Sequence, residues 1–284
     1  ISSFFDHEDN YIKGYQDTNT PVFYSPENTA RALGSLYRYK QIKERASRKN
    51  AALPKIKKAA EEIILKAVDN KQKALDEYEA KQLLACYGVP VTKEARTAKV
   101  EDALRAAKKI GYPVALKACS WKIMHKSGKG LISLNVENEN QLKKEFKNIQ
   151  KNAGKSVPVL VQEMLGGSRE FLAGMTRFAG FGPGVVFGLG GVFTEVFKDT
   201  TLRLAPVTSA DALEMFEDIN ARKLLDKFRG LPKVKLNNLS GVIQALGNIA
   251  LLHPQIAEID LNPIIINGAE PVVADALIVL EDKS

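Results

Sequence analysis

The sequence predicts an α+β fold of two lobes, and three observations favour it. Helix-like and strand-like segments alternate between about residues 75 and 118. Short apolar segments separated by glycines follow between residues 157 and 204, a pattern that is typical of strands. Two helical stretches, at about 209–228 and 240–252, then precede a final hairpin. Strands and helices in this order indicate sheets with helices packed on them.

The first predicted helix follows residue 25. Ser25 has the side chain of an N-cap, and Pro26 suits the first helical position because its missing N–H is not needed there. A charged stretch comes after the helix, and we place a domain boundary near Ser47.

Two further helices are predicted to end at glycines, Gly88 and Gly111, because glycine readily adopts the backbone conformation that stops a helix. A strand of residues 89–92 follows the first of them, and a strand of residues 112–118 follows the second. The buried stripes of these helices are Ala80, Leu83, Leu84 and Tyr87 in one, and Leu104, Ala107 and Ile110 in the other.

Composition limits the class of protein. The 284 residues are 45% hydrophobic, enough for one large core or two smaller ones. We expect a cytoplasmic protein, because no apolar run approaches the roughly 20 residues that span a bilayer and the N-terminus lacks a signal-peptide pattern. Cys86 and Cys119 lack the spacing of a zinc site or disulfide framework, so both are expected in the core. The first residue is Ile1, which suggests a start inside a longer polypeptide.

The chain carries 41 basic and 33 acidic residues, a net charge of +8. Such an excess attracts nucleic acid, CoA or nucleotide phosphates, or it is simply a solvated basic surface. We expect no nucleic-acid partner, because an aromatic platform and a basic recognition helix are both missing from the sequence.

The final hairpin brings carboxylates together. Asn267-Gly268 is the strongest short signal for a two-residue hairpin turn. With Ile266 opposite Ala269, Asp260 would lie opposite Asp275. Oxygen ligands of this kind suit Mg²⁺, which takes one or two carboxylates completed by waters and phosphates. The alternative is a solvated polar face of the sheet with a lysine as counter-charge.

Two other segments are candidates for phosphate contact. Gly190 and Gly191 lie in a glycine-rich connection whose N–H groups are able to meet phosphate, although glycine is also ordinary in tight strand connections. Lys117 ends an apolar strand, and a basic loop with His125 follows. Lysine reaches phosphate as a point charge, and histidine is a nucleophile toward phosphorus or merely a surface imidazole. His253 follows the last predicted helix, and we expect no partner for it.

Two segments resemble the same protein family. The first is residues 111–134, in which a Pro-Val-Ala-Leu-Lys strand precedes a His-Lys-Ser loop, and the second is residues 258–280. The family is the ATP-grasp subunit of the ADP-forming acetyl-CoA synthetases, the NDP-forming acyl-CoA synthetase group, and it is more distantly similar to the succinyl-CoA synthetase beta subunit. The resemblance extends from about Leu53 to the end. Residues 20–39 also resemble the last strand and helix of the CoA-ligase half of single-chain members.

The resemblance implies a two-lobed ATP-grasp domain over residues 71–284. A connector of residues 47–70 and the C-terminal end of a CoA-ligase domain, residues 1–46, would precede it. The implied cofactors are ATP or ADP and Mg²⁺. For the nucleotide, the resemblance implies that Lys117 contacts phosphate, that Gln162, Glu163 and Met164 form a hinge beside adenine with Glu163 at the ribose, and that Glu170 lines the same cleft. For the metal, it implies that Asn262 and Asp275 bind Mg²⁺. For the transfer itself, it implies that Asp260 lies beside the transferred phosphate and that His125 carries the phosphoryl group.

The implied reaction interconverts acyl-CoA, ADP and phosphate with carboxylic acid, CoA and ATP through phosphohistidine. CoA-binding and ligase domains, in the same polypeptide or in a partner subunit, would complete it, and a homo-oligomer is compatible with the sequence. The alternative is a regulatory or degenerate ATP-grasp module of a protein acetyltransferase. Two positions depart from the family pattern: Gly128-Lys129 replaces an acidic residue, and the segment after Arg229-Gly230 lacks an aspartate.

Overall fold

The computed structural model describes residues 21–23, 25–46, 53–123, 129–191, 199–227 and 229–281. The chain divides into two compact units, Ile1–Ala51 and Ala52–Ser284. In the first unit, α2 (Pro26–Ala46) begins as predicted, because the Ser25 hydroxyl accepts a hydrogen bond of 3.2 Å from the Asn28 N–H.

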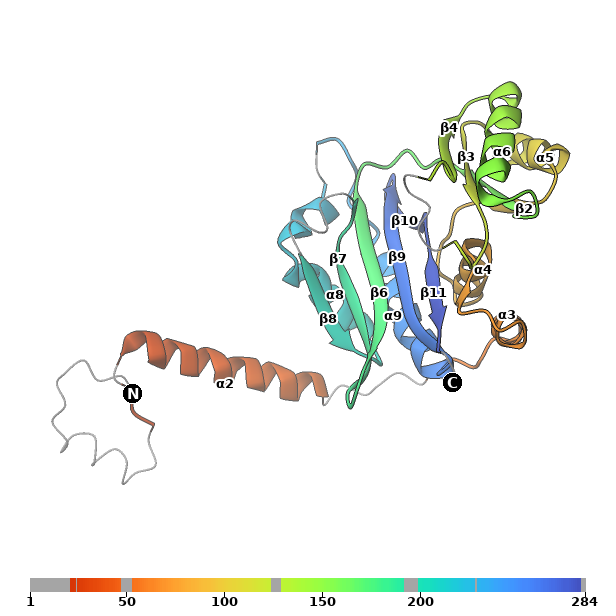
Figure 1. Cartoon of the computed structure of the whole chain (residues 1–284). Coiled ribbons are helices and arrows are strands. Elements are labelled where there is room, and N and C mark those ends of the chain that lie inside the picture. The colour runs from red at the N-terminus through yellow and green to blue at the C-terminus, as the bar shows by residue number, and fades with distance from the viewer. Residues whose placement is uncertain are drawn as a thin grey trace. The chain divides into compact units, whose positions relative to one another are not determined.

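The described part of the second unit contains a seven-stranded and a four-stranded sheet, and paired strands in both run antiparallel. Figure 1 shows that each sheet lies in a lobe of its own. The large sheet consists, in spatial order, of β1 (Ala74–Leu75), β11 (Leu277–Leu280), β9 (Ile256–Asn267), β6 (Glu170–Phe178), β7 (Gly182–Leu189) and β8 (Thr200–Leu204), with β10 (Glu270–Val273) also paired to β9. The small sheet consists of β2 (Glu94–Thr97), β5 (Val159–Glu163), β3 (Val114–Ala118) and β4 (Ile132–Val136).

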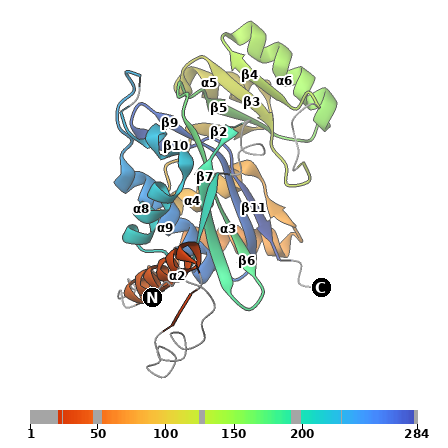
Figure 2. The ribbon, with the colours of Figure 1, turned by 90° about the vertical axis from the view of Figure 1, so that its left-hand side faces the viewer.

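Helices cover both sheets. In the large lobe, α8 (Ser209–Asp218) and α9 (Leu236–Leu252) pack on the sheet, and the short 3-10 helix η2 (Asn220–Leu225) follows α8. In the small lobe, α5 (Val100–Ile110) and α6 (Glu139–Ala153) pack on the sheet, as Figure 2 shows from a second side. Helices α3 (Lys58–Asp69) and α4 (Glu77–Cys86) pack against each other, and α4 also contacts strands of both sheets. In the described residues, no helix combines the length and apolar character needed to cross a membrane.

Capping residues explain the start of α4 and α8 and the end of α5. Asp76 and Glu79 form a reciprocal capping box at the start of α4, and Thr208 with Asp211 does the same for α8. Gly111 follows α5 with a φ of 101°, a conformation that glycine adopts without strain, so this predicted end is confirmed. The strand predicted at residues 89–92 is wrong. Only Val91 makes a bridge there, to Val273, and the strand itself is β2.

Two hydrophobic cores form, one in each lobe. The large one includes a stack of Phe171 and Phe187, whose ring centroids are 5.5 Å apart, with Phe216 edge-on to Phe187. Cys119 is buried and Cys86 only partly buried, and neither forms a disulfide.

His253 has a partner, contrary to the expectation from sequence. Its Nε2 atom lies 2.6 Å from the Tyr87 hydroxyl, which joins the end of α9 to the end of α4. The two residues are 166 positions apart, so local sequence gave no sign of the contact. Burial lowers the pKa of His253, and the more distant Glu61 carboxylate only partly opposes that shift.

We expect acidification to weaken this junction. Because the folded-state pKa of His253 lies below its ordinary value, the unfolded chain binds more protons just below that value, and the free energy of unfolding falls as pH falls. His253→Gln keeps an acceptor for Tyr87 but does not titrate. The drop in melting temperature between pH 7.5 and 5.5 should therefore be smaller in the variant than in the wild type. Equal drops would contradict the prediction.

Candidate nucleotide site

Lys117 lies where the two lobes meet. Strand β3 is buried along its whole length, and Lys117 is only 6% exposed. Its ammonium donates to Glu77 Oε1 at 2.6 Å and to the Ala274 carbonyl at 3.3 Å, and it lies 3.6 Å from Asp275 Oδ2. Burial lowers the pKa of Lys117, but the Glu77 and Asp275 carboxylates outweigh it, so the net pKa lies above its ordinary value. Lys117 is therefore a fixed cation that the small sheet holds beside the hairpin of the large sheet.

The predicted adenine hinge coincides with the passage between the sheets. Strand β5 of the small sheet ends at Glu163, and the chain then runs to Glu170, where β6 of the large sheet begins. Gln162 is buried, and its amide donates to the Ala274 carbonyl at 2.9 Å. Glu163 accepts a hydrogen bond of 2.7 Å from the Lys93 N–H, and Met164 is half-buried. The structure thus brings Gln162 and Lys117 to the same carbonyl group.

The predicted glycines lie against the start of β6. The Gly190 N–H donates to the Glu170 carbonyl at 2.9 Å, and an added Cβ at Gly190 would lie 2.6 Å from the Phe171 carbonyl carbon. Gly191 has a φ of 77°, and a Cβ there would lie 2.7 Å from Glu170 Oε2. The chain's own packing accounts for both glycines, so phosphate contact remains a prediction for them. Within the strand-like stretch predicted between residues 157 and 204, residues 192–198 lie outside the described residues.

The hairpin forms as predicted, but its register differs by two residues. Asn267 pairs with Glu270, so Gly268 and Ala269 form the loop, and Ile266 lies opposite Pro271 instead of Ala269. Gly268 has a φ of +63°, whereas Asn267 stays outside the positive-φ region that the predicted turn requires of it. The turn therefore begins one residue later than predicted, with Gly268 in its first loop position.

The corrected register pairs the two predicted metal ligands with each other. Val273 pairs with Ile264 and Leu277 with Asp260, and counting two residues inward from either pair places Asp275 across from Asn262. The prediction that Asp260 faces Asp275 is wrong for the same reason. Asn262 is exposed, and the Asp275 side chain is 38% exposed.

Asp260 shares the exposed face of β9 with Asn262 and Glu258. It keeps access to solvent, yet partial desolvation raises its pKa, and the carboxylates of Glu258 and Asp275 raise it further. Carboxylate charges are therefore close together at this face. In the described residues, no group of three His, Cys, Asp or Glu side chains converges on one metal position. Asn262 and Asp275 still fit Mg²⁺, because both offer oxygen and Mg²⁺ takes its other ligands from water and phosphates.

The predicted carrier His125 lies outside the described residues, as do Lys126 and Gly128. Lys129 and Gly130 are described and exposed. The ends of the loop are defined, because Lys117 pairs with Ile132 across β3 and β4.

Sequence reasoning missed a buried ionic cluster beside Lys117, formed by Glu77, Lys81 and Glu94. Lys81 is fully buried, and its ammonium donates to Glu77 Oε1 at 2.9 Å and to Glu94 Oε2 at 2.8 Å. Burial raises the pKa of Glu94, and Lys81 opposes that shift. The spacing of Glu77 and Lys81, four residues apart on a helix, was the available signal.

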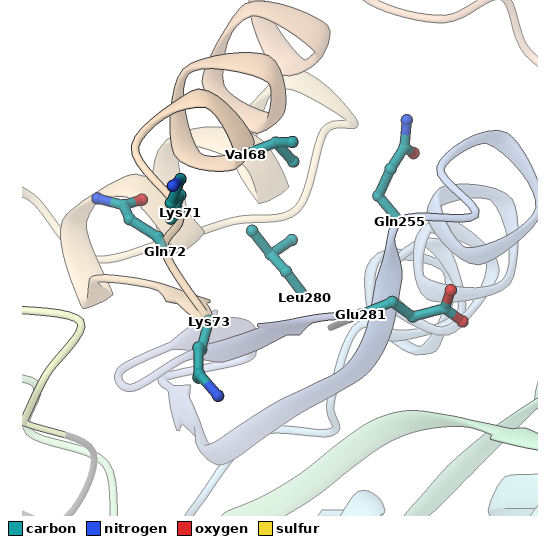
Figure 3. A pocket seen from close by; sticks show the side chains of 7 residues that line it. All are labelled: Val68, Lys71, Gln72, Lys73, Gln255, Leu280 and Glu281. Atoms are coloured by element: carbon teal, nitrogen blue, oxygen red, sulfur yellow. The ribbon is translucent and has the colours of Figure 1, made fainter. Parts of the chain in front are cut away.

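A separate pocket lies at the end of α3 and contains none of the predicted site residues. Figure 3 shows its lining, which is Val68, Lys71, Gln72, Lys73, Gln255, Leu280 and Glu281. It is not part of the candidate site.

A buried lysine of the small sheet lies against a backbone carbonyl and a carboxylate between β10 and β11 of the large sheet. Such an arrangement is typical of sites for phosphate-bearing ligands between two lobes. The chain belongs to the ATP-grasp domain family, which matches residues 66–280. The predicted fold and family are confirmed.

Curated proteins that are similar to this chain indicate which members of the family it resembles. The chain is 39% identical over 227 residues to the beta subunit of acetate–CoA ligase [ADP-forming] I from Pyrococcus furiosus, covering 78% of this chain and 97% of that subunit. It is 34% identical over 276 residues to acetate–CoA ligase [ADP-forming] I from Archaeoglobus fulgidus, covering 94% of this chain but only 40% of that protein. It is also 27% identical to a succinate–CoA ligase [ADP-forming] beta subunit from Natronomonas pharaonis, which confirms the more distant similarity.

Solved structures agree. A chain of the dinucleotide-forming acetyl-coenzyme A synthetase 1 of Ca. Korarchaeum cryptofilum superposes with a TM-score of 0.70 at 37% identity, covering 78% of this chain and all of that one. That structure holds coenzyme A and Mg-AMPPCP, with its phosphohistidine segment pointing towards the nucleotide-binding site.

Proposed function

We propose that this chain is the nucleotide-binding part of an ADP-forming acyl-CoA synthetase. The observation that carries the proposal is the approach of Lys117 to Asp275, at 3.6 Å, because it joins a phosphate-binding cation to a metal-binding carboxylate at the junction of two lobes. The relatives that align over most of this chain are ADP-forming acetate–CoA ligases, which supports the same assignment. The reaction interconverts acyl-CoA, ADP and phosphate with carboxylic acid, CoA and ATP.

Each of the predicted site residues has its own role in phosphoryl transfer. Such transfer depends on positioning and charge neutralisation more than on covalent chemistry by the protein. Lys117 neutralises phosphate oxygens, and Asn262 and Asp275 hold Mg²⁺, which when bound supplies further positive charge to the phosphates. Glu163 accepts hydrogen bonds from the ribose. Asp260 lies beside the transferred group, and burial together with the carboxylates of Glu258 and Asp275 raises its pKa.

The acyl half of the reaction belongs to CoA-binding and ligase domains, in the same polypeptide or in a partner subunit. The N-terminal part of this chain supports a fused architecture. The alignment with the P. furiosus subunit covers 78% of the chain, whereas that with the longer A. fulgidus protein covers 94%. The unit that contains α2 is therefore proposed to be the end of a ligase domain.

A regulatory or degenerate ATP-grasp module of an acetyltransferase is the alternative. It predicts loss of nucleotide or metal binding, whereas Lys117, Glu163, Asn262 and Asp275 are all present. A direct binding measurement therefore separates the two functions.

We expect the chain to bind Mg·ADP and Asp275→Asn to weaken that binding on the order of tenfold or more, because a metal ligand loses its charge. Isothermal titration calorimetry with and without Mg²⁺ measures both quantities. The variant should bind with Mg²⁺ about as weakly as the wild type binds in EDTA. Asp69→Asn, at an exposed position on α3, is the matched control and should behave as the wild type. A folded wild-type chain that binds no nucleotide would favour the regulatory module instead.

A further inference from the structure

Lys81 is the most deeply buried charged side chain among the described residues, with no exposed surface. Four oxygen atoms surround its ammonium, those of Glu77, Thr92, Glu94 and Gln162, at distances of 2.9, 3.1, 2.8 and 3.2 Å. An ammonium has three N–H groups, so these acceptors use all of them. Lys81 therefore has no donor and no surface with which to contact a nucleotide.

The partners of Lys81 come from both lobes. Lys81 and Glu77 lie on α4, whose residues Leu83 and Leu84 belong to the core of the large lobe. Glu94 lies on β2 and Gln162 on β5, both in the small sheet. Lys81 thus joins the helix of one lobe to two strands of the other.

One oxygen atom connects Lys81 to Lys117. Glu77 Oε1 accepts from Lys81 at 2.9 Å and from Lys117 at 2.6 Å. A carboxylate that is fixed by one buried lysine presents its oxygen to the second in a defined position, because buried charge-assisted hydrogen bonds have strict geometry. Gln162 acts in parallel: it accepts from Lys81 and donates to the Ala274 carbonyl, which also accepts from Lys117.

The charge balance explains why the cluster tolerates burial. Together with Lys117, the cluster contains two lysines and two glutamates, whose formal charges balance. A buried ion cluster is stable only when its charges and hydrogen bonds are matched. Within the described residues, Glu94 Oε1 has no hydrogen-bond partner, and Glu94 Oε2 accepts from Lys81 at 2.8 Å and from the Thr92 hydroxyl at 3.3 Å. Lys81 is therefore the nearest cation that balances this carboxylate.

We propose that Lys81 is a positioning residue for nucleotide binding, which acts through Glu77 on the ammonium of Lys117 without touching the ligand. The inference rests on the proposed function, because it takes Lys117 as the phosphate contact.

The test is a double-mutant cycle on the full chain, with the dissociation constant of Mg·ADP measured by calorimetry. Lys81→Met alone leaves one buried carboxylate charge unmatched, because Glu77 keeps Lys117 while Glu94 loses its lysine. It is therefore combined with Glu94→Gln, which keeps the net charge unchanged. The second change in the cycle is Lys117→Met. The matched control is Lys58→Met with Glu62→Gln, an exposed pair on α3 with the same charge change.

We expect the Lys81→Met/Glu94→Gln variant to bind Mg·ADP about tenfold more weakly, the loss that corresponds to one charge-assisted hydrogen bond. In the Lys117→Met background the same two changes should alter binding by less than about twofold, because the residue through which they act is gone. If the variant does not fold, Lys81→Gln/Glu94→Gln, which keeps a hydrogen-bond donor at position 81 and the same net charge, replaces it in the same cycle with the same expected non-additivity.

Equal losses in both backgrounds would overturn the proposal, since they would show that the cluster affects binding by general distortion. Unchanged binding in the Lys81→Met/Glu94→Gln variant would overturn it as well. If Lys117→Met binds Mg·ADP as the wild type does, the assignment of Lys117 within the proposed function fails instead, and the positioning role fails with it.

Discussion

Lys81→Met is expected to lower the free energy of unfolding by about 3–5 kcal/mol, the usual cost of removing one partner from a buried ion pair. The loss is large because the buried carboxylate of Glu94 loses its lysine partner, and Glu77 is left with Lys117 as its cationic partner. Methionine has nearly the volume of the lysine stem, so the effect arises from charge and hydrogen bonding rather than from a cavity. Urea denaturation of the wild type and the variant measures the difference.

The second change in the cluster should reverse part of this loss. Adding Glu94→Gln removes the unmatched charge and keeps the shape of the side chain. The combined variant should therefore be more stable than Lys81→Met alone. Lys58→Met, at a residue whose side chain is 90% exposed, should change the free energy of unfolding by no more than about 0.5 kcal/mol. A Lys81→Met variant as stable as this control would contradict the prediction, because it would show that the ion pairs of Lys81 add nothing to the free energy of unfolding.

Local signals in the sequence predicted the helices well. The serine and proline at the start of α2 and the glycine after α5 act through their own backbone and side chain, so no distant residue is needed to interpret them. The hairpin was also predicted, because its strands are adjacent in sequence. Its register was not, since the turn depends on whether Asn267 or Gly268 adopts the first positive φ, and the dipeptide alone allows either.

The two-residue error still left the correct side chains on one face. Side chains alternate along a strand, so a shift of two positions preserves the face and changes only the partner. Asn262, rather than Asp260, therefore lies across from Asp275. This agrees better with a metal site, because an amide facing a carboxylate avoids the repulsion of two directly opposed negative charges.

The buried cluster escaped sequence reasoning because its partners are far apart along the chain. Lys81 and Gln162 are separated by 81 residues, and Lys117 and Ala274 by 157. A lysine beside a glutamate on a helix is usually a solvated pair. Only the packing of α4 between the two sheets turns Glu77 and Lys81 into an internal group, and that packing is a property of the whole fold.

Two features bear on the loop that contains His125, although the loop itself lies outside the described residues. Its flanking strands β3 and β4 pair directly, with Lys117 opposite Ile132, so both ends of the connection start beside the proposed phosphate contact. Lys126 and Lys129 are its sequence neighbours, and cations favour a phosphorylated imidazole over a protonated one. We therefore propose that His125 carries the phosphoryl group between the ligase histidine and ADP.

His125→Ala is expected to abolish net ATP synthesis from acyl-CoA, ADP and phosphate in the complete enzyme, because the phosphorus–nitrogen bond that ADP attacks can no longer form at this residue. Binding of Mg·ADP should be unchanged, since Lys117, Asn262 and Asp275 remain, and the ligase histidine should still become phosphorylated by acyl-CoA and phosphate. Coupled ATP assays, calorimetry and radiolabelled phosphate measure the three quantities separately. His7→Ala, which changes the same residue type outside the ATP-grasp match at residues 66–280, is the control and should retain ATP synthesis. Near-normal ATP synthesis by His125→Ala would show that the ligase histidine delivers phosphate to ADP directly, and that His125 takes no part in the transfer.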